Sequence, residues 1–585
     1  ADLDVLEPTP VERRAISNAL ALGRGGRGVV MVRSSGNTRE RSLFGRSGVG
    51  DANLDGFAND PASLTVGSVR RTGRAASYST PGACLLVAAP GGEKSEGSEV
   101  FSTDPVGDAG LSTVASAGAE LSSYAFAPRV PAGTSFSAPE VSGIVAVMLE
   151  VRPELTAPEV ALALALGARQ LDPEDPLLRT NRAGLRFSPN TGFGVPDAGE
   201  AVRVARSLPR RPSPVRVTVS RREPLPIPDD GLRVRVTGSN IPPARASLPA
   251  SGGTGLHPDA PTADRPLRDV GQATGPIGES LRDQAALIQR GPNDFAEKIA
   301  FAAAAGASFV VLWNNVGLDE RLVLLRTDFA PIPAVLVGRA DGEALRSLVA
   351  TNPSARVRLE LVPARQTFQV TQALAADFVQ VRLQMEHPRL ADLRVTLLSP
   401  SGTRSVLHRA GAAANPQPAE WFYGSRAHLL EPTTGTWTLE VSDQAPGSTG
   451  SVIGADLILT GTPLEDADAD GLDDRWERAW LGGLAGEPGE DPDRDDRPHA
   501  VEQALGSDPT RDDRPWQAGI APISGGRLRL SWPGRAGWRT VVESASDPAG
   551  PFAREGSGWG SVFEGSFFVA RPDPARFLRL RVEVP

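Results

Sequence analysis

A turn of small residues that runs into an apolar helix constrains this chain more than any other stretch. Residues Gly133 to Pro139 read GTSFSAP, and the apolar run Val141 to Leu149 follows them. Pro139 suits the first turn of a helix, where its missing N–H would have no partner in any case. A helix that begins here places Ser135 at its positive end, where free backbone N–H groups can stabilise developing negative charge. Taken alone, the stretch favours the simpler interpretation of an ordinary capped helix, so the rest of the chain decides.

The residues before and around this turn predict an alternation of helices and strands. Thr9 to Glu12 forms a capping-box pattern with proline at the first helical position, and glycines then end that helix; a second capping box at Thr156 to Glu159 predicts another helix. Val29 to Val32 is typical of a strand buried on both faces of a parallel sheet, and further strands are expected at Ser63 to Val69 and Leu85 to Ala89. A polar, Gly- and Ser-rich segment from about Gly91 to Val130 is expected to be a surface loop. Helices that alternate with buried strands indicate an α/β domain.

Length and composition narrow the classes of protein. At 585 residues the chain is too long for one hydrophobic core, so we expect several domains. The net charge of −9 argues against a nucleic-acid partner. No run approaches the roughly 20 apolar residues that a membrane span needs. The one cysteine, Cys84, lies in an apolar run and is expected to pack in the core.

Short motifs occur in a fixed order between Ser35 and Pro139. They are Ser35-Gly36-Asn37, Asp55-Gly56-Phe57-Ala58-Asn59, Thr65-Val66-Gly67, Ser77-Tyr78-Ser79, Ala89-Pro90-Gly91 and the turn that begins at Gly133. In this order they resemble the C-terminal half of a subtilisin-like serine protease (subtilase) domain, most closely that of the kexin/furin branch. The resemblance implies a parallel-sheet α/β fold and a serine endopeptidase that hydrolyses protein or peptide substrates.

The resemblance also implies roles for four residues. Ser135 would be the nucleophile, and Asn37 with the Ser135 backbone N–H would form the oxyanion hole. Asp55 and Ser79 would belong to the substrate-binding site, where the Asp55 carboxylate would favour Arg or Lys before the cleaved bond. For Asp55 an equal alternative stays open, namely a carboxylate that fixes its own loop.

The base and the acid of the catalytic triad are not found in this sequence. Subtilases carry them before the oxyanion Asn, whereas the five histidines here, at 257, 387, 408, 428 and 499, all lie after Ser135. A serine hydroxyl needs such a base to become a nucleophile. We therefore expect residues 1–207 to be the C-terminal part of a catalytic domain that is truncated at its N-terminus and inactive by itself.

Two further domains are expected after the Pro- and Arg-rich linker at 208–214. Alternating apolar residues at 215–240 and again at 366–463 are typical of half-buried strands. They resemble the P domain of kexin-like proteases, a β-sandwich or jelly roll that packs on the protease. The intervening residues 241–365 resemble a protease-associated (PA) domain, an α/β insertion for which substrate gating, protein binding and plain packing all stay open.

Acidic loops at 464–512 predict calcium. The ligand positions of the first loop are Asp466, Asp468, Asp470 and Glu477. With Gly471 between them they fit the spacing D-x-D-x-D-G-x5-E, which favours a calcium loop over an acidic solvated linker. The corresponding positions of a second loop are Asp491, Asp493, Asp495 and Glu502. Asp496 replaces the glycine there, so this loop is expected to bind calcium more weakly or not at all.

The sequence as a whole supports one main hypothesis and one alternative. Residues 518–585 alternate again and predict a small C-terminal β-sandwich. The main hypothesis is a secreted, calcium-supported kexin-like serine endopeptidase, extracellular or at the cell surface, that we expect to be monomeric. The alternative is a non-catalytic extracellular binding or adhesion protein built on a degenerate protease remnant. The presence of both Asn37 and Ser135 favours the protease.

Overall fold

The computed structural model describes most of the chain and divides it into two compact units. The described residues are 5–43, 46–93, 100, 102–110, 124–125, 132–258, 260–317, 320–321, 324, 327, 329–412, 419–512, 519–523, 527–533, 539–545, 553–559, 564–570 and 577–583. One unit comprises Ala1–Pro492 with Asp496–Pro509, and the other comprises Asp493–Asp495 with Thr510–Pro585. Most of the predicted surface loop between Gly91 and Val130 therefore lies outside the described residues.

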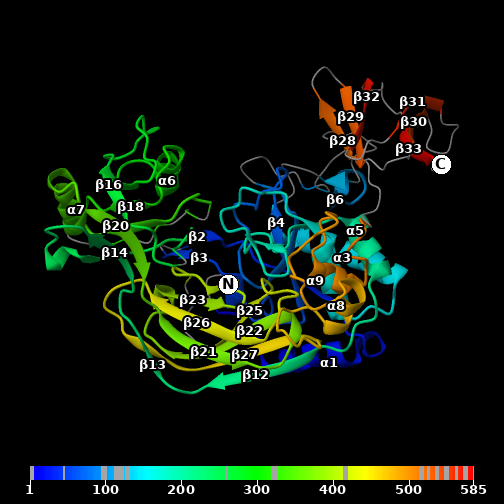
Figure 1. Cartoon of the computed structure of the whole chain (residues 1–585), viewed down its shortest axis with the longest axis horizontal. Helices are drawn as coiled ribbons and strands as arrows, with labels where there is room; N and C mark the ends of the chain where they lie inside the picture. Colours follow the sequence, from blue (N-terminus) through cyan, green and yellow to red (C-terminus); the bar gives the residue numbers. More distant parts are fainter. Residues whose placement is uncertain are drawn as a thin grey trace. The chain divides into compact units, whose positions relative to one another are not determined.

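The subtilase-like segment, in which Figure 1 labels β4 and α3, is built on a parallel sheet with the strand order β1-β4-β5. Its strands are β1 (Met31–Ser34), β4 (Ser63–Val69) and β5 (Leu85–Pro90), and its helices are α1 (Pro10–Gly26), α3 (Thr134–Val151), α4 (Ala157–Leu166) and α5 (Ala198–Ser207). Capping boxes at Thr9 and Thr156 begin α1 and α4 as predicted, because each hydroxyl accepts the N–H of a glutamate three residues on. Apolar side chains of β4, β5 and α3 to α5 share one core.

Short elements complete this segment. They are β2 (Glu40–Leu43), β3 (Arg46–Val49), η1 (Ala52–Leu54), β6 (Ser102–Thr103), η3 (Gly107–Ala109), β7 (Tyr124–Ala125), β8 (Ala168–Arg169), β9 (Arg179–Thr180), β10 (Arg186–Phe187) and β11 (Val195–Pro196). The prediction for Val29 to Val32 was wrong in one respect. Val29 is 38% exposed and β1 is half-buried, because β1 is an edge strand, whereas the other edge strand, β5, is covered by Phe193 and Gly194, which bond to its backbone. β4 is buried throughout because it has a strand on each side.

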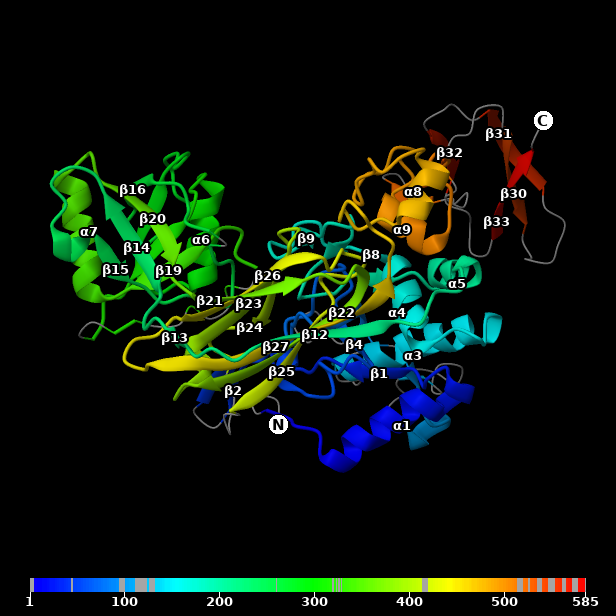
Figure 2. The same ribbon diagram turned by 60° about the horizontal axis from the view of Figure 1, so that its bottom comes forward.

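The PA-like segment is a seven-stranded mixed sheet with the order β15-β14-β20-β16-β17-β18-β19. Its elements are β14 (Leu232–Thr237), η4 (Pro243–Arg245), β15 (Ser247–Pro249), β16 (Arg265–Asp269), β17 (Ala285–Gln289), α6 (Phe295–Ala304), β18 (Val310–Trp313), β19 (Ala334–Val337), α7 (Arg339–Thr351) and β20 (Arg356–Leu361). Helices α6 and α7 flank the sheet, and each of its faces has a hydrophobic core (Figure 2). β14 pairs with β15 and β20, so residues 232–237 belong to this sheet. The assignment of all of 215–240 to the P domain is therefore wrong for these residues.

The P-like segment is an antiparallel sandwich. One sheet has the order β12-β27-β22-β25, with β13 also paired to β27, and the other has the order β21-β26-β23-β24. Their bounds are β12 (Val215–Arg221), β13 (Leu225–Ile227), β21 (Ala364–Val370), β22 (Leu374–Glu386), η5 (Leu390–Asp392), β23 (Leu393–Leu398), β24 (Arg404–His408), β25 (Glu420–Ser425), β26 (Gly435–Asp443) and β27 (Gly450–Pro463). The fully buried Phe368, Tyr423 and Trp437 lie in the core between the sheets.

Direct hydrogen bonds join the P-like sandwich to the subtilase-like segment. The Asn59 amide donates to the carbonyl of Phe422 at 2.6 Å, and the Trp421 indole donates to the carbonyl of Asn53 at 2.7 Å. The buried Arg426 guanidinium donates to two subtilase carbonyls, those of Pro61 and Ser63, at 3.1 and 3.2 Å. The P-like sandwich is thus part of the structure that holds the subtilase-like strands in place.

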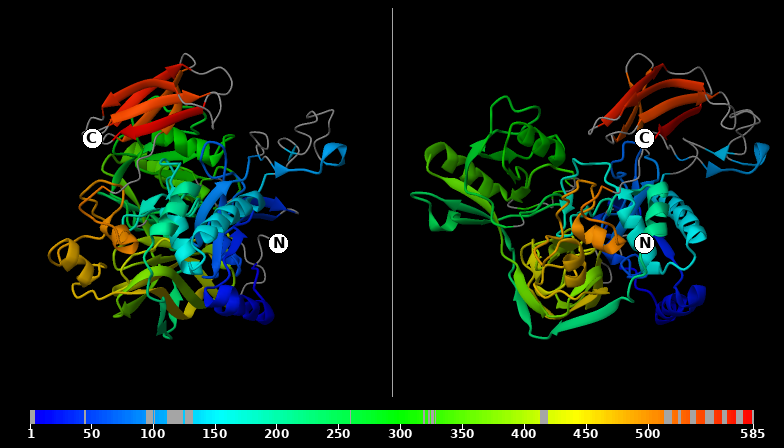
Figure 3. Two further views of the ribbon diagram at one scale, coloured as in Figure 1. Left: turned by 90° about the vertical axis from the view of Figure 1, so that its right-hand side faces the viewer. Right: turned by 45° about the vertical axis from the view of Figure 1, so that its right-hand side comes forward.

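Two short helices and six strands end the chain. The acidic loops lead into α8 (Asp474–Trp480) and α9 (His499–Leu505). The last strands are β28 (Gly519–Ile523), β29 (Arg527–Pro533), β30 (Arg539–Ala545), β31 (Ala553–Trp559), β32 (Glu564–Ala570) and β33 (Phe577–Glu583). They form two three-stranded antiparallel sheets, β28-β29-β32 and β31-β30-β33, drawn in orange and red in Figure 3. Within the part of the chain described here, no helix combines the length and apolarity needed to cross a membrane.

Candidate active site and calcium loop

Ser135 is exposed in the first turn of α3, and two bonds attach this turn to the end of β5. The Gly133 N–H donates to the carbonyl of Gly91 at 2.9 Å, and the Ser137 hydroxyl donates to the carbonyl of Ala89 at 2.8 Å. A Cβ on Gly91 would lie 2.1 Å from the Ser68 hydroxyl, so only glycine fits this close approach. The sheet therefore fixes the helix start from which Ser135 projects.

Asn37 lies against the same helix start. It follows β1, and its side-chain oxygen accepts both the N–H and the hydroxyl of Thr134 at 2.9 Å. Because Thr134 occupies the oxygen, the Nδ2 group of Asn37 is left to donate elsewhere, beside the residue that precedes Ser135. The structure thus brings together two site residues that are 98 positions apart in the sequence. Sequence reasoning missed the role of Thr134, which is visible only in its contact with Asn37.

The loop around Tyr78 bonds to the segment that follows Asn37 and to the end of β5, which holds the start of α3. The Arg39 N–H donates to the carbonyl of Tyr78 at 3.1 Å, and the Tyr78 hydroxyl donates to the carbonyl of Gly91 at 2.7 Å. Burial raises the pKa of Tyr78 to about 12, so the phenol stays protonated and able to donate. Ser79 is fully buried, and its hydroxyl accepts the Ser68 N–H at 2.9 Å. This contact supports the sheet, and the substrate-binding role of Ser79 stays a prediction.

Asp55 makes contacts within its own segment. One carboxylate oxygen accepts the N–H groups of Phe57 and Ala58 at 2.8 and 3.3 Å. The other oxygen accepts two N–H groups of Arg33, at 3.1 and 2.6 Å. The first pair of contacts fits a carboxylate that fixes its loop, and the second shows that the same carboxylate can hold a guanidinium.

The five histidines are buried and engaged away from Ser135. His257 bonds to the carbonyl of Gly253, His387 to Asp443, His408 to the carbonyl of Leu390, His428 to Glu431 and His499 to the carbonyl of Glu487. Burial lowers the pKa of His257 to about 3 and that of His408 to about 4, so both are neutral at physiological pH. No contact between a histidine and Ser135 is present in the described residues.

Local hydrogen bonds fix the backbone of the first acidic loop. Asp466 accepts the N–H groups of Asp470 and Gly471 at 3.2 and 3.1 Å, which curls the loop around the carboxylates. Gly471 has a φ of 104°, in the region where glycine is favoured, and a Cβ there would lie 2.8 Å from Pro432. The glycine predicted at position 6 of the loop is therefore required by the turn and by the contact.

The carboxylates of this loop converge. Oxygens of Asp468, Asp470 and Glu477 lie within 4.8 Å of one another, and so do oxygens of Asp466, Asp468 and Asp474. Glu477 is 0% exposed, and within the described residues its Oε2 and the Oδ2 of Asp470 have no hydrogen-bond partner. Burial and the neighbouring carboxylates raise the pKa of Asp470 to about 7. Buried oxygens without donors and with raised pKa values fit a hard cation, for which oxygen is the preferred ligand.

The second loop is formed by local bonds. The Asp496 N–H donates to Asp491 at 2.9 Å, the Asp495 N–H donates to Asp493 at 3.2 Å, and Glu502 is fully buried on α9. Asp496 has a φ of 65°, where the first loop has glycine. Aspartate tolerates this conformation better than most residues other than glycine, and the weaker calcium binding of this loop stays a prediction.

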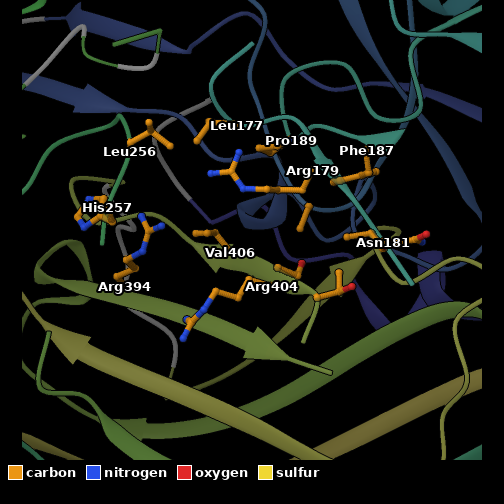
Figure 4. A pocket seen from close by; sticks show the side chains of 14 residues that line it. Leu177, Arg179, Asn181, Phe187, Pro189, Leu256, His257, Arg394, Arg404 and Val406 are labelled. Carbon is orange, nitrogen blue, oxygen red and sulfur yellow. The ribbon is translucent and has the colours of Figure 1, made fainter. Parts of the chain in front are cut away.

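A separate cavity of about 70 Å³ lies among the subtilase-like, PA-like and P-like segments (Figure 4). Arg179, His257, Arg394 and Arg404 contribute polar groups, and residues such as Val406 make its wall apolar. Arg404 is already paired with the buried Glu440 at 2.6 Å. This cavity contains none of the predicted site residues, so it is distinct from the candidate active site.

Comparison with known proteins identifies three segments. The subtilase family matches residues 5–194, the PA domain matches residues 244–345, and the proprotein convertase P-domain matches residues 376–459. Proprotein convertase subtilisin/kexin type 7 of Mus musculus is 28% identical over 199 residues, 34% of this chain and 23% of that protein. The dibasic-processing endoprotease of Schizosaccharomyces pombe is 30% identical over 203 residues, 34% of this chain and 24% of that protein.

The chain spans less than a quarter of the length of these two curated relatives. Among solved structures, the serine protease of Aeromonas sobria matches with 18% identity and a TM-score of 0.48, over 79% of this chain and 70% of that one. The chain thus carries a subtilase-family segment, a PA domain and a proprotein convertase P-domain, and its relatives are proteases of the kexin/furin type.

Proposed function

We propose that this chain belongs to a secreted serine endopeptidase of the kexin/furin type and carries the C-terminal part of its catalytic domain, with Ser135 as nucleophile and Asn37 as oxyanion donor. The contact between Asn37 and Thr134 carries the proposal, because it holds the carboxamide beside the exposed Ser135. The subtilase-family match over residues 5–194 supports it independently.

In this proposal Ser135 Oγ attacks the carbonyl carbon of a peptide bond. The negative charge moves to the carbonyl oxygen, which accepts hydrogen bonds from Asn37 Nδ2 and the Ser135 N–H. Because Thr134 holds the Asn37 oxygen in place, the Nδ2 donor needs no reorientation when the charge appears. The proton of Ser135 goes to a histidine outside these 585 residues, so the chain alone is inactive.

Cleavage after a basic residue is the finer part of the proposal. Asp55 supports it, because its carboxylate already binds the guanidinium of Arg33 at 2.6 Å. A substrate arginine would replace Arg33 in this contact. The printed name of the fission-yeast relative, a dibasic-processing endoprotease, is in keeping with such a substrate.

We also propose that the first acidic loop holds a calcium ion. Asp466, Asp468, Asp470 and Glu477 would bind it, and the two buried oxygens without donors support this assignment. Calcium would neutralise carboxylates that otherwise repel one another, and it would thereby stabilise the fold.

The test uses a longer protein, in which this chain is joined to the residues that its coding DNA specifies upstream. We expect an Asp and a His in subtilase motifs there, and we expect the joined protein to hydrolyse a fluorogenic peptide that ends in Arg while residues 1–585 alone do not. Hydrolysis by residues 1–585 alone would refute the claim that the catalytic base lies outside these residues. An upstream sequence without these motifs would favour the alternative, a non-catalytic extracellular binding protein.

A further inference from the structure

Helix α9 packs into the core of the subtilase segment. Ala500, Val501 and Leu505 are all buried, and they belong to one hydrophobic cluster with Val204 and Leu208 at α5. A helix of seven residues is too short to be stable by itself in water. The acidic-loop region and the subtilase segment therefore share a core.

The same helix contacts the first acidic loop. The Gln503 side chain of α9 accepts the N–H of Asp473 at 2.6 Å. Leu472, which is 0% exposed, lies between the ligand positions 470 and 477 and joins the same hydrophobic cluster as Val501. The first loop is thus coupled to α9 by the hydrogen bond between Asp473 and Gln503 and by the buried side chain of Leu472.

Polar contacts also attach this region to the subtilase segment. Arg182 pairs with Glu487, and Arg497 pairs with Glu200 of α5 at 3.4 Å. A Cβ on Gly184 would lie 2.3 Å from the ring of Pro498, which immediately precedes α9, so Gly184 lies directly against this ring. Of these contacts, the pair between Arg497 and Glu200 joins the residues just before α9 to α5.

Helix α5 in turn is bound to the helix that carries Ser135. Arg152, which caps the C-terminal end of α3, donates to the carbonyls of Ala205 at 3.0 Å and Leu208. Met148 of α3 and Val204 of α5 are both buried in the shared cluster. The path from the first loop to α3 is therefore continuous: loop, α9, α5, α3.

We propose that calcium at the first loop controls the stability of the subtilase segment, because α9 can pack on α5 only while the loop is held together. This inference rests on the proposed calcium site. Without a cation, Glu477 keeps a buried oxygen that has no donor in the described residues, beside the carboxylates of Asp468 and Asp470. That arrangement favours an open loop, and an open loop breaks the bond between Asp473 and Gln503 and withdraws Leu472 from the cluster that it shares with α9.

The experiment measures amide hydrogen exchange of the full 585-residue chain with and without calcium chloride. Calcium affinity is measured in parallel by titration calorimetry. If α5 opens only after the ion leaves, exchange in α5 at a calcium concentration of 100 Kd slows by about 100-fold. We expect this slowing in α5 (Ala198–Ser207) and in the C-terminal half of α3 as well as in the loop itself.

Four variants separate the steps. Glu477→Gln should abolish both calcium binding and the slowing in α5, whereas the matched change Glu174→Gln, at a glutamate that is 78% exposed in its side chain, should alter neither. Val501→Ala with Leu505→Ala should still bind calcium and protect the loop, but should lose the slowing in α5. The single variant Val501→Ala gives the same test with a smaller effect if the double variant does not fold.

The outcomes distinguish the effect of calcium on the subtilase segment from the existence of the calcium site. Calcium binding by the wild type with unchanged exchange in α5 would overturn the inference and leave the calcium site standing. No calcium binding would overturn the calcium site and the inference together. Neither result bears on Ser135 as nucleophile, which is tested by other means.

Discussion

Asp51 connects the subtilase segment to the P domain, and its substitution gives a sharp test of that junction. It is 4% exposed. One carboxylate oxygen accepts the Asn53 N–H at 3.0 Å, and the other accepts the backbone N–H of Arg409, a P-domain residue, at 3.2 Å. Burial raises the pKa of Asp51 to about 6, and these bonds, with the charge of Arg409, only partly offset it.

The raised pKa of Asp51 makes the free energy of unfolding depend on pH. A carboxyl whose pKa is raised on folding stabilises the folded state below its unfolded pKa, and this stabilisation is lost as the pH rises through the folded value. A rise from 3.8 to about 6 corresponds to about 3 kcal/mol. We therefore expect Asp51 to contribute about 3 kcal/mol less to the free energy of unfolding at pH 7 than at pH 3, with most of the loss between pH 4 and pH 6.

Asp51→Asn is the matched control, because the amide keeps one acceptor oxygen and carries no charge. Urea unfolding of both proteins is followed by tryptophan fluorescence, to which Trp421 at this junction contributes. The stability of the wild type relative to Asp51→Asn should fall as the pH rises. A difference that is constant from pH 4 to pH 7, or one that moves in favour of the wild type, would refute the reasoning.

Three further predictions concern the proposed enzyme and its P domain. In the protein joined to its Asp and His, Asn37→Ala should lower kcat by about 10²–10³-fold with little change in KM; an unchanged kcat in steady-state peptide hydrolysis would exclude Asn37 as the oxyanion donor. Asp55→Asn should reduce the preference for Arg over Leu before the cleaved bond by about tenfold or more, and a lower melting temperature with unchanged preference would leave only the loop-fixing role. Arg426→Met should lower the free energy of unfolding by about 3 kcal/mol, because it removes the bonds to two subtilase carbonyls; a loss below about 1 kcal/mol in urea unfolding would show that the P domain is held by other contacts.

The sequence predicted best those features that depend on neighbouring residues. The capping boxes at Thr9 and Thr156 begin helices because their bonds close within three residues. The curl of the first acidic loop follows from the spacing between Asp466 and Gly471, because one aspartate accepts the N–H groups that follow it. The family motifs around Asn37 and Ser135 predicted the subtilase segment, which the comparison with known families supports.

The sequence could not predict which distant segments meet. Alternation at Leu232, Val234 and Val236 indicates a strand with one buried face, but the period is the same in either sheet, and the pairing of β14 with β20 decided its place. The apolar run at Val29 to Val32 indicated full burial, whereas β1 is a half-buried edge strand. The sharing of one core by α9 and α5 is likewise a consequence of tertiary packing that no local pattern contains.

Covalent labelling of Ser135 tests the central claim most directly. The protein joined to its upstream Asp and His is treated with a fluorophosphonate probe, and the modified peptide is identified by mass spectrometry. The account predicts modification at Ser135, loss of the label in Ser135→Ala, and no modification of residues 1–585 alone, because an exposed serine without a base is not a nucleophile. A joined protein that folds and yet stays unlabelled, or a label that persists in Ser135→Ala, would contradict the account.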